Sequence, residues 1–295
     1  MPRGPAPEKG LPPPPRLDPP APWPVGPARW EFRTPLVMGV LNVTPDSFSD
    51  GGCYLEPGRA LERARQLEAE GADLIDVGGS SSHPRAEPVT AQTELERVAP
   101  VVERLARESA VPISIDTTQP AVAEECLRLG AHLINDVSGL TCLDMAQVAA
   151  RHDVPLVVTH NGWALPGRSA GESLMAGLQR FFRERIAQLA ELRVRRVIVD
   201  PGYGFGKTLE ENLVLLRSLN GLRSLKRPVL ICTSRKGSLG RIVGEPDPRE
   251  RLGATLSTSL FAAFQGAAMI RVHDVKPFRQ ALQAWQAVKA APREI

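Results

Sequence analysis

The stretch Met38-Gly-Val-Leu-Asn-Val-Thr-Pro-Asp-Ser-Phe-Ser-Asp-Gly-Gly52 passes from apolar to polar sequence within a few residues. It begins inside an apolar run, residues 36–41, that has no helical period, and Asn42 opens a segment rich in Thr, Pro, Asp, Ser and Gly. This pattern predicts a buried strand that ends in a polar loop. The amide of Asn42 and the carboxylates of Asp46 and Asp50 suit a metal or anion site, although each residue alone is ordinary in a turn.

Short apolar runs alternate with segments of helical period along the rest of the chain. The runs predicted as further strands are 74–77, 113–116, 133–135, 155–159, 197–200, 229–232 and 269–272. The segments predicted as helices are 60–67, 95–105, 122–129, 145–150, 174–192, 212–219, 239–243, 255–264 and 278–288. Uniform alternation implies parallel strands, and eight of them imply a closed (β/α)8 barrel, the TIM barrel. A doubly wound sheet is the alternative, but no G-x-G-x-x-G follows the first strand.

Length and composition suit one large domain with a tail. The chain has 295 residues, 42% of them hydrophobic and 5% aromatic, and a single α/β barrel commonly takes about 250 residues. Residues 1–28 are rich in proline, which prevents helix or sheet from propagating, so we expect a disordered or polyproline-like tail. A docking motif for proline-binding domains is the alternative there. Residues 29–295 are predicted as the barrel domain, with a small strand at 30–34.

The charge and the cysteines limit the partners and the compartment. The formal net charge is +3 and no long basic run occurs, so we expect no nucleic-acid partner, while a small anionic ligand remains compatible. The four cysteines form no C-x-x-C pair, which favours a reduced, cytoplasmic protein. Neither a membrane span nor the apolar core of a signal peptide is evident, so we expect no insertion into a membrane and no export.

All eight predicted strands end in polar or charged side chains. These are Asn42, Asp76, Asp116, Asn135 with Asp136, His160, Asp200, Ser234 with Arg235 and Lys236, and Arg271 with His273. In a parallel barrel the carboxyl ends of the strands share one face, so the side chains are expected to meet in one pocket. Buried carboxylates with a lysine suit a nitrogen-rich heterocycle. Arg271 and His273 beside Asn42 suit an anion bound with Mg2+.

Each of these positions also has an ordinary structural explanation. Asp116 and Asp200 fit helix caps or Asx turns, and Asn135 and Asp136 could satisfy backbone donors. His160 fits a core imidazole. The pair Arg235 and Lys236 fits an exposed turn, and Arg271 with His273 fits a solvated strand edge. The glycines of Asp200-Pro-Gly-Tyr-Gly-Phe-Gly-Lys207 lack the spacing of a phosphate loop, and we expect them to let the backbone approach a flat ligand.

With these motifs in view, residues 30–288 closely resemble the dihydropteroate synthases. The resemblance lies in segments 38–52, 71–79, 113–117, 130–139, 200–207, 234–236 and 270–275. It implies a TIM barrel that condenses (7,8-dihydropterin-6-yl)methyl diphosphate with 4-aminobenzoate, giving 7,8-dihydropteroate and diphosphate in folate biosynthesis. It also implies Mg2+ as cofactor, a homodimer and a sulfonamide target.

The resemblance assigns a role to each matching residue. Catalysis would depend on Asp116, Asp200, Lys236, Arg271 and His273. The pterin would be bound by Asp116, Asn135, Asp200, Lys236 and Arg271. The diphosphate would be bound by Asn42, Arg271 and His273. Mg2+ would be held by Asn42 and Asp50. The aminobenzoate pocket would be formed by Thr44, Pro45, Phe48, Ser82 and Pro84. The implied chemistry is dissociative and needs no activated nucleophile.

Three segments depart from the family pattern. The second loop reads Gly78-Gly-Ser-Ser-Ser-His-Pro-Arg85, whereas relatives usually have Gly-Gly-Glu-Ser-Thr-Arg-Pro-Gly. Gly237 replaces the serine that often follows Lys236, so the aminobenzoate carboxylate would bind backbone N–H groups there or Ser238. Thr159-His-Asn-Gly162 replaces Met-His-Met. These departures leave two alternatives open: a non-catalytic pterin-binding paralogue, and a methyl-transferring relative that binds reduced folate.

Overall fold

Eight parallel strands form the central sheet of the computed structural model, which describes residues 21–44, 57–81, 87, 89–165, 167–169 and 171–292. The strands are β3 (Leu36–Asn42), β4 (Leu74–Gly78), β5 (Ile113–Asp116), β6 (Leu133–Asp136), β7 (Leu156–Thr159), β8 (Val197–Asp200), β9 (Leu230–Ile231) and β10 (Met269–Val272). Their order is β8-β7-β6-β5-β4-β3-β10-β9, and a parallel bridge between Val199 and Val229 joins the two ends. The predicted barrel is confirmed, with the strands close to their predicted positions.

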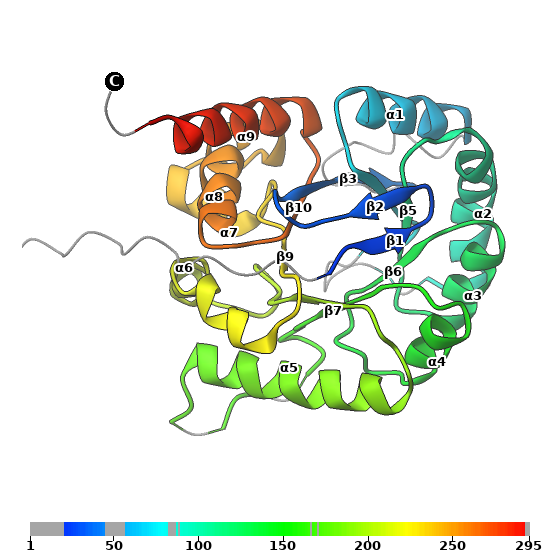
Figure 1. Cartoon of the computed structure of the whole chain (residues 1–295), viewed down its shortest axis with the longest axis horizontal. Helices are drawn as coiled ribbons and strands as arrows, with labels where there is room; N and C mark the ends of the chain where they lie inside the picture. Colours follow the sequence, from blue (N-terminus) through cyan, green and yellow to red (C-terminus); the bar gives the residue numbers. More distant parts are fainter. Residues whose placement is uncertain are drawn as a thin grey trace, which may run out of the picture.

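The helices form a ring around the strands (Figure 1). They are α1 (Pro57–Ala69), α2 (Ala91–Glu108), α3 (Pro120–Arg128), α4 (Asp144–Arg151), α5 (Leu174–Glu191), α6 (Leu209–Arg217), α7 (Gly237–Val243), α8 (Leu252–Phe264) and α9 (Val275–Ala290), with 3-10 turns η1 (Leu219–Leu225) and η2 (Pro248–Glu250). In α2 the buried residues Val98, Val101, Val102 and Leu105 recur at the helical period that predicted this helix. Side-chain caps define where several helices begin; at α6, Thr208 and Glu211 form a capping box.

Strand side chains alternate between two cores. Those that point outward, such as Ile75 and Val77 of β4, pack against the helices in the larger core. Those that point inward near the start of the strands, such as Leu74 and Met38, form a smaller core inside the barrel. The next inward residues are polar and buried; Asp76, Asn135, Thr159 and Asp200 belong to this layer. A polar floor therefore lies beneath the carboxyl-terminal mouth of the barrel.

A hairpin of β1 (Trp23–Val25) and β2 (Ala28–Trp30) covers the opposite mouth (Figure 1). Val25 and Trp30 are buried against the inner core. The boundary predicted at residue 28 falls inside this hairpin, and the strand predicted at 30–34 ends at Trp30. Gly26, with φ +53°, provides the turn of the hairpin. Aromatic side chains, among them Trp30 and Phe32, supply apolar contacts that the high proline content of this segment did not indicate. The rest of the predicted tail, residues 1–20, lies outside the described residues.

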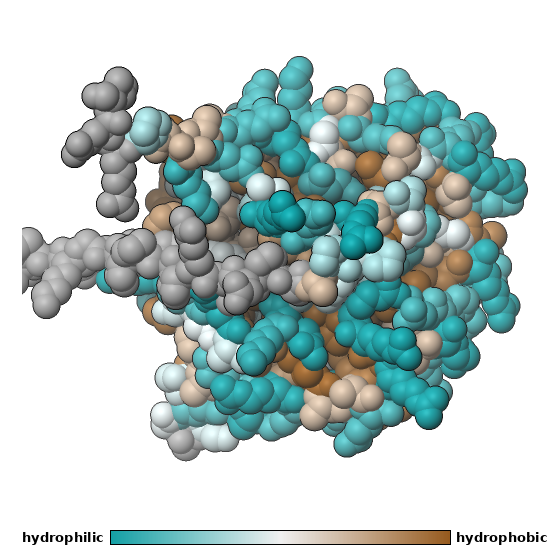
Figure 2. Space-filling model, in the orientation of Figure 1, coloured by the Kyte–Doolittle hydropathy of each residue, from teal (hydrophilic) through white to brown (hydrophobic). Residues whose placement is uncertain are grey.

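The surface at the hairpin end is mostly polar. Figure 2 shows hydrophilic side chains over most of the outer rim of helices. Among the described residues, no helix combines the length and the apolar character that a membrane crossing requires.

Candidate active site

A cavity of about 640 Å³ opens at the carboxyl-terminal ends of the strands. The predicted site residues that line it are Asn42, Thr44, Asp116, Lys236, Arg271 and His273, together with Ser80, Gly237 and Ser238 from the departing segments. Asn135 and Asp200 do not line the cavity and lie buried in the polar floor. The predicted residues Pro45, Phe48, Asp50, Ser82 and Pro84 lie outside the described residues.

Positive charge predominates in the cavity wall. Five cationic side chains line it: Lys207, Arg235, Lys236, Arg241 and Arg271. Among the described lining residues, Asp116 supplies the only carboxylate. Concentrated positive charge in a concave site attracts anions. The cavity is therefore suited to a negatively charged ligand, as the sequence indicated.

Arg271 is the centre of a buried ion-pair network. Its Nε donates to Asp76 Oδ2 at 2.6 Å, and its Nη2 donates to Asp116 Oδ2 at 2.8 Å. Asn135 Nδ2 donates to the same oxygen of Asp76 at 3.0 Å. The alternative of a solvated strand edge is wrong for Arg271, because its side chain is only 15% exposed.

The two predicted carboxylates, Asp116 and Asp200, have raised pKa values. Burial raises the pKa of Asp116 to about 7 and that of Asp200 to about 6. Lys236 and Arg271 oppose both shifts, so both cations act on both carboxylates. Asp200 Oδ1 also accepts from the Gly202 N–H at 2.7 Å, as in the predicted Asx turn. The carboxylates thus belong to one electrostatic unit, although only Asp116 reaches the cavity wall.

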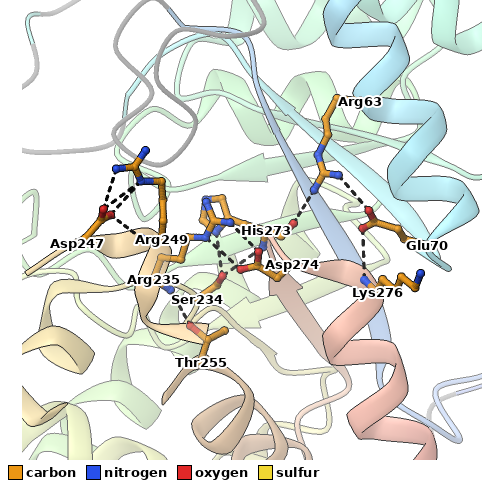
Figure 3. A network of polar contacts seen from close by, with 10 residues as sticks. All are labelled: Arg63, Glu70, Ser234, Arg235, Asp247, Arg249, Thr255, His273, Asp274 and Lys276. Atoms are coloured by element: carbon orange, nitrogen blue, oxygen red, sulfur yellow. Dashed lines mark hydrogen bonds and ion pairs between the residues drawn. The ribbon is translucent and has the colours of Figure 1, made fainter. Parts of the chain in front are cut away.

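His273 is held in one orientation by its neighbours (Figure 3). Its backbone N–H donates to Ser234 Oγ at 3.2 Å, and its Nδ1 lies 2.9 Å from the same oxygen. The Ser234 hydroxyl keeps a proton that it can donate to Nδ1, an arrangement that corresponds to the tautomer with the N–H on Nε2. Arg63 of α1 donates from Nη2 to the His273 carbonyl at 2.8 Å.

Burial favours the uncharged form of the His273 imidazole. Burial lowers its pKa well below the ordinary value, and Arg235, Arg271, Lys236 and Arg63 lower it further. A neutral imidazole cannot neutralise an anion, but its Nε2–H can donate a hydrogen bond to one. The positive charge for an anion therefore comes from the surrounding arginines and Lys236.

The turn before α7 is fixed by contacts of Arg235, which Figure 3 shows with Asp274 and Thr255. Arg235 has a left-handed backbone, φ +58°, and its guanidinium donates to both carboxylate oxygens of Asp274 at 3.0 and 2.6 Å. Its backbone N–H donates to Thr255 Oγ1 at 3.1 Å. The exposed-turn explanation is wrong for Arg235, because its side chain is 14% exposed. Lys236 Nζ lies 4.3 Å from the centre of the Phe205 ring, within cation–π range.

Some predicted polar residues have the ordinary roles. Asp136 accepts from the backbone of Ser138 at 2.7 Å and Leu140 at 3.0 Å, so it satisfies backbone donors. His160 packs edge-on against Phe181 and lies 3.1 Å from Lys207 Nζ through Nδ1. Burial lowers the pKa of His160 to about 4, which fits a neutral interior imidazole. These residues support the loops around the cavity and do not line it.

Several lining or supporting residues were not assigned from the sequence. Asp76 was recognised as a polar strand end but given no role. Lys207 and Phe205 lie in the glycine-rich segment, where a cation and an aromatic residue between glycines were the available signal. Trp163 and Arg241 line the cavity from a loop and from α7, and no sequence pattern points to them.

The described donors are compatible with the predicted Mg2+. Asn42, a half-buried residue at the end of β3, lines the cavity and carries a side-chain oxygen. No group of three carboxylate, histidine or cysteine side chains able to hold a metal occurs among the described residues. Mg2+ commonly binds through one or two protein oxygens together with substrate phosphates and waters. This donor set fits an ion that binds together with a diphosphate.

Comparison with known proteins bears on this site. A family model described as pterin binding enzyme matches residues 38–273. The dihydropteroate synthase of Bacillus subtilis (strain 168) is 44% identical over 243 residues, which cover 82% of this chain and 84% of the relative. That of Synechocystis is 40% identical over 269 residues, covering 88% and 93%.

Solved structures of dihydropteroate synthases are also similar to this chain. Yersinia pestis dihydropteroate synthase with a sulfonamide drug complex is similar at TM-score 0.86 and 37% identity, over 92% of this chain and all of the other (100%). The Xanthomonas albilineans enzyme with 4-aminobenzoic acid has TM-score 0.84 and 40% identity, covering 90% and 96%. The same enzyme in complex with 7,8-dihydropteroate has TM-score 0.79 and 36% identity, also covering 90% and 96%.

Proposed function

The chain belongs to the family of pterin-binding enzymes, and on that premise we propose that it catalyses the dihydropteroate synthase reaction. The bond between the pterin methylene carbon and the diphosphate oxygen breaks, and its electron pair leaves with the diphosphate. The amino nitrogen of 4-aminobenzoate forms the new bond to carbon and loses a proton, giving 7,8-dihydropteroate. The curated relatives that carry this activity in their names cover more than four fifths of the chain.

One observation carries the proposal: a cavity whose described lining has five cationic side chains and one carboxylate opens above buried carboxylates and an amide. Asp116, Asp200 and Asn135 supply acceptors for the N–H and amino groups of a pterin, and Lys236 supplies a donor. Arg271 and the Nε2–H of His273 are suited to the diphosphate. Such groups stabilise the charge that develops on the leaving oxygens, so no activated nucleophile is required.

The second substrate is assigned to the wall formed by aromatic and polar side chains. Phe205 and Trp163 lie with ring centres 5.4 Å apart, and Thr44 lines the same cavity. Pro45, Phe48, Ser82 and Pro84 are proposed to complete this pocket. The Ser238 hydroxyl donates to Tyr203 at 3.0 Å. Because Gly237 has no side chain, the backbone at the start of α7 is accessible to a carboxylate.

We further propose Mg2+ as the cofactor, held by Asn42 and by Asp50 from the first loop. When bound it would neutralise charge on the diphosphate. Removal of divalent ions with a chelator should then abolish turnover, and added Mg2+ should restore it. Unchanged turnover in the chelator would contradict this assignment.

The compartment and the sulfonamide response are proposed on separate grounds. Cys126, Cys142 and Cys232 are free thiols, as expected in a reducing compartment, which supports the cytoplasm. A relative has been solved with a sulfonamide drug, and we infer that sulfonamides compete with 4-aminobenzoate here.

The decisive experiment is an assay of the purified protein with the pterin diphosphate, 4-aminobenzoate and Mg2+. We expect 7,8-dihydropteroate by mass spectrometry and one diphosphate for each product molecule. Tight pterin binding without turnover would instead support the non-catalytic paralogue. Omission of 4-aminobenzoate is the control, since product formation requires both substrates.

A further inference from the structure

Arg271, expected to contact the pterin diphosphate, is held by a buried residue that does not line the cavity. Asp76 accepts from Arg271 Nε at 2.6 Å, while Asp116 accepts from Nη2 at 2.8 Å. Asp116 lines the cavity and is available to a ligand. Asp76 does not line the cavity and is 0% exposed. Its Oδ2 accepts from Arg271 and Asn135, and its buried Oδ1 has no hydrogen-bond partner among the described residues.

One oxygen of Asp76 also determines how Asn135 is oriented. Asn135 Nδ2 donates at 3.0 Å to Oδ2, the same oxygen that accepts from Arg271. An ionised carboxylate only accepts, so this contact assigns the amide NH2 to Asp76 and turns Asn135 Oδ1 away from it. That amide oxygen is buried and has no hydrogen-bond partner among the described residues. Asn135 thus keeps an acceptor free for an N–H group.

The barrel topology creates this contact. Ile75 and Val77 point into the outer core, so Asp76 between them points into the barrel. Asn135 belongs to β6 and Arg271 to β10, two strands away on either side of β4 in the sheet order. The three side chains meet only because the sheet curves around the interior.

We propose that Asp76 is a positioning residue that holds Arg271 and Asn135 in the orientation required to bind the pterin diphosphate, an inference that rests on the function proposed above. Asp76 fixes Nε of the guanidinium, while Asp116 accepts from Nη2. Asp76 also sets the hydrogen-bonding polarity of Asn135. Loss of its charge leaves Arg271 tethered through Asp116 alone, and frees the Asn135 amide to rotate.

Asp76→Asn tests this with little change in shape. Loss of a charge-assisted hydrogen bond should raise KM for the pterin diphosphate by about tenfold or more, while KM for 4-aminobenzoate changes by less than about twofold. The matched control is Asp73→Asn. Asp73 precedes the same strand at the other end of the barrel and pairs with Arg279 at 2.6 Å. This control removes a similar ion pair and should leave both KM values unchanged.

Equal losses for both substrates, equal losses in the two variants, or unchanged kinetics in Asp76→Asn would overturn the proposal. If Asp76→Asn does not fold, Asp76→Glu provides the test, because it keeps the charge and moves the carboxylate relative to Arg271 and Asn135. A more than about tenfold weaker affinity for the dihydropterin diphosphate is expected, and near-native affinity would overturn the proposal. A wild-type protein that makes no dihydropteroate would refute the proposed function instead, which separates the two failures.

Discussion

Burial raises the pKa of Asp116 to about 7, so this residue changes charge within the accessible pH range. Asp76 and Glu94 raise it further, and Arg271 and Lys236 oppose the shift. The unfolded chain has an aspartate pKa of about 3.9. Between these two pKa values the folded state binds more protons at Asp116 than the unfolded state does. The contribution of Asp116 to the free energy of unfolding is therefore fully present below about pH 4 and is lost as the pH rises through 7.

Asp116→Asn isolates this effect, because the asparagine does not titrate. We expect the difference in free energy of unfolding, wild type minus variant, to fall from pH 4 to pH 7 by up to about 1.4 kcal/mol per pH unit and then to level off. Urea unfolding of both proteins at several pH values measures it. A pH-independent difference would mean that Asp116 has an ordinary pKa. The variant should also lose pterin binding, and retained affinity would mean that the pterin pocket lies elsewhere.

Trp163 is 50% exposed at the cavity, an unusual position for a large aromatic residue. Its backbone N–H donates to Asn161 Oδ1 at 3.0 Å, and its ring faces Phe205. If it forms the wall for the second substrate, Trp163→Ala should raise KM for 4-aminobenzoate about threefold to tenfold, and Trp163→Phe should raise it less. Steady-state kinetics with each substrate varied in turn provide the measurement. An effect on the pterin diphosphate alone would contradict this placement.

At the scale of elements, Lys207 joins the loops after β7 and β8. Its Nζ contacts the carbonyls of His160, Gly202 and Phe205 at 3.2, 3.0 and 3.2 Å. Removal of this donor leaves the His160 carbonyl without a hydrogen-bond partner among the described residues, at a cost of about 1–3 kcal/mol, whereas the Gly202 and Phe205 carbonyls still accept from backbone N–H groups. We expect Lys207→Met to lower the melting temperature. It should also lower kcat/KM by more than about tenfold, because the Phe205 carbonyl loses its hydrogen bond from Lys207 Nζ.

Lys226→Met is the control for Lys207→Met, since Lys226 is exposed. The melting temperature and kcat/KM of Lys226→Met should equal those of the wild type. Full activity of Lys207→Met at a temperature where it is folded would show that Lys207 does not position the aromatic wall.

The hairpin β1–β2 covers the mouth opposite the cavity, so its packing should affect stability and leave catalysis unchanged. Trp30 is 2% exposed and belongs to the inner core. Trp30→Ala should lower the free energy of unfolding by about 3–5 kcal/mol. Trp30→Phe should cost less, because the indole N–H has no partner among the described residues. A fall in kcat/KM well below the melting temperature would contradict this separation.

For the whole molecule, periodicity predicted the barrel because each strand and helix has its own local apolar pattern. Polar strand ends then predicted most of the cavity wall, since parallel strands bring their ends to one face. The role of Asp76 was not predictable in this way, because it arises from contacts between β4, β6 and β10. Trp163 and Arg241 reach the cavity through loop and helix geometry. The hairpin was missed because proline was interpreted as disorder.

Assembly is the remaining property of the whole molecule, and we propose a homodimer. Exposed apolar side chains lie on two helices that both contact α8: Leu213 and Val214 on α6, and Ile242 and Val243 on α7. Each of them is 45–53% exposed, and exposed apolar side chains can be covered by an interface. A charge introduced there should separate the subunits, because burial of an unpaired carboxylate is unfavourable.

Val243→Glu should therefore convert a dimer to a monomer in light scattering after size exclusion, while the wild type remains dimeric at the same concentration. Val288→Glu is the matched control: Val288 on α9 is 77% exposed and lies on another helix, so its replacement should not change the mass. A monomeric wild type would refute the dimer. If Val288→Glu separates the subunits and Val243→Glu does not, the dimer interface lies on α9, because an introduced charge disrupts only an interface in which it becomes buried.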